Sequence, residues 1–245
     1  MFFKLSLLSL LSLAVLAHPS ARIQPSPEEK RLEEAGGFFQ GDMRFPPGRN
    51  GLTNSNQRWT NNVVYYDISP SFTEPEKNYI LGAINAIQAA SCVRFERRTN
   101  QNNYVYVTRE NSGCWSYVGM IGGRQDLNLQ ANGCVYHGTA VHEFLHALGF
   151  HHQQSASSRD NYVSIEWGNI QSGLEGNFDK YSSSYVTDFG YGYDYESIMH
   201  YDQYAFSKNG GRTITTHNPA YQSVIGNRGD LSHADIQKLR AMYGC

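Results

Sequence analysis

The residues best suited to chemistry lie between positions 142 and 152, in the sequence His-Glu-Phe-Leu-His-Ala-Leu-Gly-Phe-His-His. His142 and His146 are four residues apart, so on a helix both side chains leave the same face about one turn apart. Gly149 can end this helix in a sharp turn, because glycine tolerates backbone angles that other residues avoid. The chain can then return with His152 as a third ligand. The pattern predicts a zinc site with three histidine ligands and one open position, which is the arrangement of catalytic zinc.

Glu143 lies beside the first of these histidines on the same expected helix. Zinc lowers the pKa of its bound water from 15.7 towards about 7. Glu143 is placed to accept the proton of that water and to pass it to a leaving amine. The alternative, that the histidines are ordinary core residues, is disfavoured because the added glycine and third histidine make a chance match rare. We therefore expect hydrolysis of peptide bonds, with Glu143 as the general base.

The surrounding segments show the spacing of helices and strands that could position this motif. Apolar residues at helical spacing predict a helix from Tyr136 to Gly149. A helix is also predicted from Thr73, because Pro75 suits a first helical turn. Residues 63–66 and 104–108 are β-branched and aromatic, and they are predicted to be strands.

The second half of the chain has a different pattern. Residues 155–229 are rich in Gly, Ser, Tyr and Asn with few periodic apolar runs, so they are expected to form mostly loops. A last helix is predicted from Ser232, where Asp235 completes a capping box.

The beginning of the chain has the pattern of a secretory leader. An apolar run over residues 5–16 follows Lys4, and it is shorter than the roughly 20 residues that span a bilayer. We therefore predict a signal peptide at residues 1–17, secretion to the extracellular space and no membrane anchor. Residues 18–49 are rich in Pro, Glu and Gly, which predicts an extended or mobile propeptide rather than a packed domain. Residues 50–245 then form the catalytic domain.

Charge and cysteine content exclude other classes of protein. A formal net charge of −2 leaves no basic surface of the kind that a nucleic-acid-binding protein needs. The four cysteines of an extracellular chain favour two disulfide bonds over free thiols, with three pairings open. Cysteine ligands for zinc are disfavoured, because no two cysteines have the spacing of zinc knuckles.

Motifs outside the zinc helix resemble the astacin family of metzincin peptidases. The resemblance covers nearly all of the chain from Arg49 onward. Besides the zinc motif, it rests on four stretches: CWSYVG at 114–119, LQANGCVYHG at 129–138, RDNYV at 159–163 and YESIMHY at 195–201. It implies an α+β fold, a two-lobed metzincin-type domain. A twisted sheet and two helices would form the N-terminal lobe, and a loop-rich C-terminal lobe would close the cleft.

The resemblance also implies roles for single residues. Met199 would form an apolar floor under the zinc ion. Tyr201 would be a further zinc ligand that swings aside and helps to stabilise the oxyanion of the reaction. The implied disulfides are Cys92 with Cys245 and Cys114 with Cys134.

The propeptide is part of the resemblance. Residues 39–42, Phe-Gln-Gly-Asp, match the Phe-x-Gly-Asp segment of the family. This match implies that the Asp42 carboxylate takes the place of the water on zinc in the zymogen. Catalysis would begin when an activating protease cuts near Arg49 and leaves Asn50 as the new N-terminus.

Two positions bear on activation and specificity. The family usually has Glu directly after the third histidine, where it engages the buried new N-terminus, but this chain has Gln153. An amide can still accept a hydrogen bond, although without the charge-assisted part. Arg228 resembles an arginine that, in some relatives, favours an acidic substrate side chain after the scissile bond. A solvated surface arginine is the alternative.

The expected protein is a secreted zinc endopeptidase with one zinc ion per chain, acting on protein or peptide substrates. No targeting module follows Cys245, so we expect a monomer. A zinc-binding pseudo-enzyme is disfavoured because the general base Glu143 is present. Another metzincin family is disfavoured by Tyr201 and by the absence of a cysteine in the propeptide.

Overall fold

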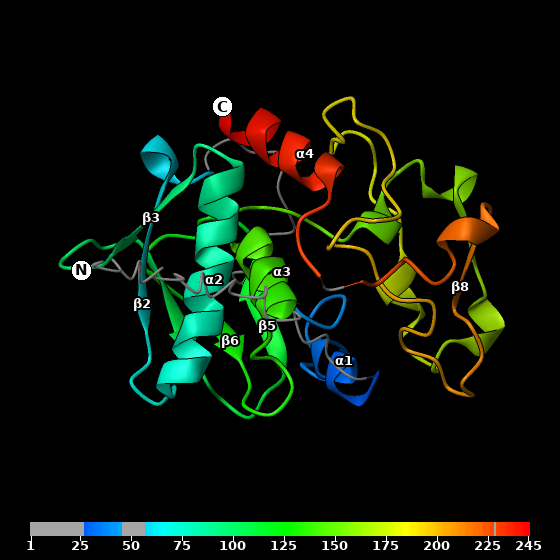
Figure 1. The fold of residues 1–245 in the computed structure, drawn as a ribbon. Helices are drawn as coiled ribbons and strands as arrows, with labels where there is room; N and C mark the ends of the chain where they lie inside the picture. Colours follow the sequence, from blue (N-terminus) through cyan, green and yellow to red (C-terminus); the bar gives the residue numbers. More distant parts are fainter. Residues whose placement is uncertain (1–26, 46–56, 228) are drawn as a thin grey trace, which may run out of the picture.

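The computed structural model describes residues 27–45, 57–227 and 229–245. The predicted signal peptide, the expected cleavage point between Arg49 and Asn50, and Arg228 lie outside these residues. The described chain has two parts (Figure 1): a sheet covered by helices, and a region made mainly of loops around the short strand β8 (Ile214–Thr216). This is the α+β, two-part arrangement that the resemblance implies.

The sheet of the first part has six strands in the order β1-β5-β6-β4-β2-β3. Neighbouring strands run parallel, except that β5 and β6 are antiparallel. Both predicted strands are present, as β2 and β4, and each places buried valines in the core. The strand bounds are β1 Met43–Arg44, β2 Val63–Ile68, β3 Arg94–Arg97, β4 Tyr104–Thr108, β5 Cys114–Tyr117 and β6 Arg124–Leu129.

Two long helices, α2 (Glu74–Ala90) and α3 (His137–Ala147), lie side by side against this sheet (Figure 1). The helix α2 begins with a capping box, in which the Glu76 carboxylate accepts a hydrogen bond from the Thr73 backbone N–H at 2.8 Å. Its inner face buries isoleucines at helical spacing: Ile80, Ile84 and Ile87. The helix α3 carries the zinc motif and is buried from Gly138 to Ala147. It is therefore the central element that fixes the site.

The second part consists mainly of loops, as expected, with a separate small core. Its one two-stranded sheet among the described residues pairs β7 (Val163–Ile165) with β8. Buried Phe178, Phe206 and Ile170 form the centre of its own apolar cluster. Short 3-10 turns supply most of the remaining regular structure: Gln153–Ser155, Arg159–Asn161, Trp167–Asn169, Glu175–Phe178 and Pro219–Tyr221, with Thr60–Asn62 in the first part.

The last helix, α4 (His233–Tyr243), returns the chain to the first part. Ser232 and Asp235 form the predicted capping box at its start. Leu239 and Tyr243 are buried in the main core. Cys245 is bonded to Cys92, and Cys114 to Cys134, which is the pairing that the resemblance implies.

The expectation of an extended propeptide is wrong for its described portion. Residues Pro27–Glu34 form the helix α1, and residues 43–44 form β1 at the edge of the sheet. The helix is favoured locally by Arg31 in its last turn, because a positive charge there stabilises the C-terminal end of a helix. Leu32 also packs against the main core. Figure 1 shows α1 between the two parts of the molecule. Packing against the folded domain therefore stabilises a helix that the composition of the segment does not predict.

No helix within the described ranges combines the length and the apolar character needed to cross a membrane.

Candidate active site

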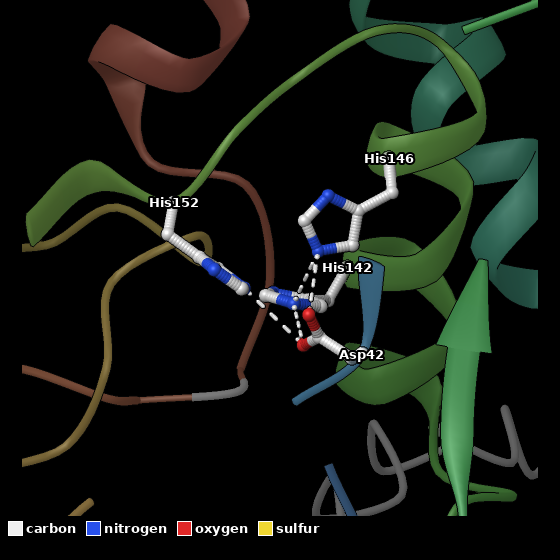
Figure 2. A group of neighbouring side chains, drawn as sticks. All are labelled: Asp42, His142, His146 and His152. Atoms are coloured by element: carbon white, nitrogen blue, oxygen red, sulfur yellow. Dashed lines mark hydrogen bonds and ion pairs between the residues drawn. The ribbon is translucent and has the colours of Figure 1, made fainter. Parts of the chain in front are cut away.

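The helix α3 presents two histidines to one point, as the sequence predicts. His142 and His146 are fully buried, and their Nε2 atoms are 3.1 Å apart. The helix stops just before Gly149, whose φ of +107° lies in the left-handed region that favours glycine. The chain then doubles back, so that the His152 ring lies 5.4 Å from the His142 ring and 4.8 Å from the His146 ring (Figure 2). The three predicted zinc ligands are therefore brought together.

A separate acceptor holds the other ring nitrogen of each histidine. His142 Nδ1 donates to the Ile198 carbonyl at 2.9 Å, and His146 Nδ1 donates to the Phe150 carbonyl at 2.8 Å. His152 Nδ1 donates to the side-chain oxygen of Gln40 at 3.0 Å. Because these oxygens can only accept, the proton of each neutral ring stays on Nδ1, and each Nε2 carries a lone pair.

A carboxylate completes the group. Asp42 Oδ2 is 3.1 Å from His142 Nε2 and 3.2 Å from His152 Nε2, and Oδ1 is 3.5 Å from His146 Nε2 (Figure 2). Burial raises the pKa of the Asp42 carboxyl, but the neighbouring imidazoles of His152, His146 and His142 outweigh this effect, so the net shift is downward. Burial lowers the pKa of His152 to about 3, which keeps that ring neutral at neutral pH. Asp42 is thus ionised in a fully buried place.

This donor set fits a zinc ion. Four buried acceptor atoms, one from each of Asp42, His142, His146 and His152, lie within 4.8 Å of one another. Lone pairs and a carboxylate at such distances repel unless a cation lies between them. Ligands at about 2.0–2.1 Å from a tetrahedral zinc ion stand roughly 3.3 Å apart, which is close to the 3.1 Å between the Nε2 atoms of His142 and His146. Three imidazoles and one carboxylate are also ligand types that zinc accepts.

The turn at residues 197–201 is tied to the site by hydrogen bonds. Asp235 at the start of α4 accepts hydrogen bonds from Ser197 Oγ at 2.6 Å and from the Ile198 N–H at 2.9 Å. The same turn offers the Ile198 carbonyl to His142 and the Met199 carbonyl to the Gln153 N–H at 2.9 Å. The Met199 side chain is buried in the main core. The turn therefore links α4, the zinc helix and the segment that carries the third histidine.

Tyr201 lies at the edge of the group. Its ring centroid is 4.6 Å from that of His152, and its hydroxyl donates to the backbone carbonyl of Gln40 at 2.5 Å. The phenol thus reaches a peptide carbonyl two residues before Asp42.

Glu143 follows His142 on α3 and is fully buried.

The segment that delivers Asp42 is bent tightly. Gly41 N donates to the Phe38 carbonyl and Met43 N to the Phe39 carbonyl, each at 3.0 Å. Gly41 has a φ of +90°, and a Cβ there would lie 2.6 Å from the Glu33 carbonyl oxygen, so glycine is required at this position. The turn places Gln40 and Asp42 on the same group of histidines.

Gln40 was missed as a site residue by sequence reasoning. It is buried, its side-chain oxygen accepts from His152, and its side-chain nitrogen donates to Ser155 Oγ at 2.9 Å. A glutamine next to Gly-Asp is a weak signal, because nothing local indicates a contact with residues more than 110 positions away.

Gln153 has a partner that sequence reasoning also missed. Its side-chain oxygen accepts a hydrogen bond from the Lys238 ammonium at 2.8 Å. Burial lowers the pKa of Lys238, and the nearby carboxylates of Asp235, Asp194 and Asp188 oppose that shift. Both residues line a cavity of about 610 Å³ that also reaches Gln57. An ammonium from α4 therefore already lies against the amide that replaces the family's glutamate.

Comparisons with known proteins agree with this geometry. Residues 51–244 match the family model described as Astacin, a family of peptidases. The chain is 36% identical over 256 residues to zinc metalloproteinase nas-6 of Caenorhabditis elegans, covering 96% of this chain and 74% of that protein. It is 41% identical over 225 residues to blastula protease 10 of Paracentrotus lividus, covering 89% of this chain but only 37% of that protein.

A solved structure is also similar. High choriolytic enzyme 1, a hatching enzyme zinc-protease from Oryzias latipes, superposes with a TM-score of 0.73 at 38% identity. The match covers 80% of this chain and 100% of that one.

Proposed function

The chain belongs to the astacin family of zinc metallopeptidases and is a zinc metalloendopeptidase, and we propose that it is secreted as a zymogen in which Asp42 blocks the zinc site. The convergence of three buried Nε2 atoms with one carboxylate carries this proposal. His142, His146 and His152 would hold the zinc ion, and Asp42 would take the fourth place until the propeptide is removed.

The catalytic roles follow from the positions of the protein groups. Bound zinc supplies an acidified water and polarises the scissile carbonyl. Glu143, fixed on α3 beside His142, accepts the proton of the attacking water and passes it to the leaving amine. The Tyr201 hydroxyl, which donates to the Gln40 carbonyl in this state, donates to the developing oxyanion of the substrate.

Inhibition in the zymogen rests on several contacts of one segment. Asp42 faces the three histidines, the Gln40 carbonyl engages Tyr201, and β1 adds a strand to the sheet beside β5. A substrate therefore finds the metal position, the oxyanion donor and the edge strand occupied together. Cleavage near Arg49 by an activating protease frees the segment to leave.

Secretion is supported by the leader pattern of residues 1–17 and by the disulfides Cys92–Cys245 and Cys114–Cys134, since such bonds persist in oxidising compartments. Substrates are proteins or extended peptides, because β5 becomes an edge strand when β1 leaves and can then pair with a peptide backbone. We propose that the chain acts as a monomer.

The test is proteolysis of a denatured protein by the full chain, before and after limited proteolysis at Arg49. We expect activity only after processing, its loss with a zinc chelator and its return with added zinc. Glu143→Gln should bind one zinc ion and lose about 10²–10⁴-fold in kcat, whereas Glu175→Gln, an exposed glutamate of the loop region, should match wild type. Activity that survives chelation, or a fully active Glu143→Gln, would refute the proposal.

A further inference from the structure

The guanidinium group of Arg44 lies on three aromatic rings. Its central carbon is 4.7 Å from the centroid of Phe38, 4.6 Å from that of Trp115 and 5.0 Å from that of Tyr117. Cations within about 6 Å of a ring centroid are attracted by the electron-rich face of the ring. Phe38 belongs to the propeptide, but Trp115 and Tyr117 belong to β5 of the catalytic part. Two of the three rings therefore remain when the propeptide leaves.

The strand β5 is the one to which a substrate would add once β1 has left. In this structure β1 is the outermost strand and pairs with β5, with Arg44 opposite Tyr117. Ser116 N donates to the Asp42 carbonyl at 2.9 Å, and Val118 N donates to the Arg44 carbonyl at 3.2 Å. Without β1, these N–H groups become the exposed edge of the sheet, where an extended peptide can bind by strand addition.

The two rings on β5 are held in place by contacts within the catalytic part. Trp115 and Tyr117 are two residues apart on one strand, so their side chains share a face of the sheet. Their centroids are 6.3 Å apart at an interplanar angle of 83°. Trp115 Nε1 donates to Ser112 Oγ at 3.0 Å. Phe38 also packs on Trp115, with centroids 5.1 Å apart, but the ring contact and the Ser112 hydrogen bond lie wholly within the catalytic part.

The register places these rings close to the chemistry. Arg44 is two residues from Asp42, whose carboxylate lies among the zinc-binding histidines. At about 3.3 Å per residue in an extended strand, the backbone of Arg44 lies roughly 7 Å along the edge of the sheet from that of Asp42. A substrate paired with β5 would place a side chain there two residues from its scissile bond.

We propose that Trp115 and Tyr117 form a substrate subsite for an arginine or lysine side chain, two residues from the scissile bond, and that Arg44 occupies this subsite in the zymogen. The proposal rests on the proposed peptidase function. Arginine is preferred over lysine, because its planar guanidinium stacks on rings. The Arg44 side chain thus shows how an arginine side chain of a substrate would lie on the two rings.

The test measures peptide binding, so that it does not depend on turnover. The full chain carrying Glu143→Gln is folded, freed of residues 1–49 by limited proteolysis and titrated by fluorescence anisotropy. The two probes are extended peptides that differ only by arginine or citrulline at the tested position, since citrulline has nearly the same shape without the charge. One ring contact is worth about fivefold in affinity at a partly exposed site, so we expect the arginine peptide to bind about five- to twentyfold more tightly.

Variants assign the preference to the ring. Tyr117→Leu should reduce the arginine-to-citrulline ratio about fivefold, whereas Tyr117→Phe should retain it. Tyr106→Leu is the matched control, because Tyr106 also lies under a guanidinium, that of Arg124 at 4.1 Å, but on the inner strand β4. It should leave the ratio unchanged.

Equal binding of the arginine and citrulline peptides at every position flanking the scissile bond, or a ratio that Tyr117→Leu does not change, would overturn the subsite. A processed wild-type chain that cleaves no peptide while the ratio persists would overturn the peptidase function but leave the subsite standing. Cleavage of peptides with no preference for arginine over citrulline would leave the peptidase function standing and overturn the subsite.

Discussion

Asp42 Oδ2 lies 3.1 Å from His142 Nε2, although 100 residues of sequence separate the two side chains. In the proposed zymogen, this one residue closes the place where a catalytic zinc site needs an open position. The left-handed turn at Gly41 and the pairing of β1 with β5 hold the buried Asp42 carboxylate in this position.

Removal of this carboxylate should unmask activity without processing. A contact to a charged group is worth about 1.5–3 kcal/mol, so the unprocessed Asp42→Ala chain should be about ten- to a hundredfold more active than the unprocessed wild type. It should remain below the processed enzyme, because Gln40 and β1 still occupy the cleft. Hydrolysis of a quenched fluorescent peptide measures this difference. Asp67→Ala, at an exposed ion pair with Arg97, is the control, and an Asp42→Ala chain as silent as the control would contradict the blocking role.

Tyr201→Phe should slow the chemical step. Loss of one donor to an oxyanion costs about 10²–10³ in kcat, while the zinc content and KM of the processed enzyme should change little. Tyr191→Phe, at a tyrosine that is 47% exposed, serves as the control. An unchanged kcat in steady-state assays would show that the Tyr201 hydroxyl acts only on the Gln40 carbonyl of the zymogen.

The helix α1 should hold less firmly as the pH rises. Burial raises the pKa of Glu34 from 4.5 to about 8; the hydrogen bond from the Phe206 N–H opposes this shift and the Asp202 carboxylate adds to it. The folded state thus keeps a proton that the unfolded chain loses near pH 4.5. Stability from this group is full below pH 4.5, declines as the pH rises towards 8 and stays low above it.

Urea unfolding of the full chain at pH 5, 7 and 9 measures this effect. Glu34→Gln, which cannot ionise, should gain stability relative to wild type as the pH increases, whereas the exposed Glu175→Gln should follow wild type at each pH. A difference between Glu34→Gln and wild type that is constant from pH 5 to 9 would mean that Glu34 does not titrate in this range.

The two disulfides should differ in their contribution to stability. Cys92–Cys245 closes a loop of 153 residues and Cys114–Cys134 one of 20. From loop entropy alone, replacement of the first pair by alanine should cost about 2 kcal/mol more than replacement of the second. Denaturant unfolding of the processed enzyme compares them. An equal or smaller cost for the first pair would show that packing around the buried Cys114 and Cys134 outweighs chain entropy.

Local patterns made the zinc helix predictable. The i, i+4 spacing of His142 and His146, and the glycine that lets His152 return, are features of a single short segment. The helix start at Thr73 and the capping box at Ser232 are local in the same way, and the structure has both where the sequence indicated.

Contacts between distant segments could not be predicted in this way. Nothing near Gln40 indicates that it would hold His152, and nothing near Asp235 indicates that its carboxylate would support the turn at Ile198. The helix α1 was missed because its composition is that of a mobile segment, and its order depends on docking against the folded domain.

The zinc site is tested most directly by a crystal structure of the unprocessed chain loaded with zinc, with the ion located by anomalous diffraction at its absorption edge. We predict one zinc ion bound by Nε2 of His142, His146 and His152 at about 2.0–2.1 Å, with an oxygen of Asp42 at about 2.0–2.2 Å. A zinc ion bound elsewhere, or one whose fourth ligand is water while Asp42 lies apart, would contradict it.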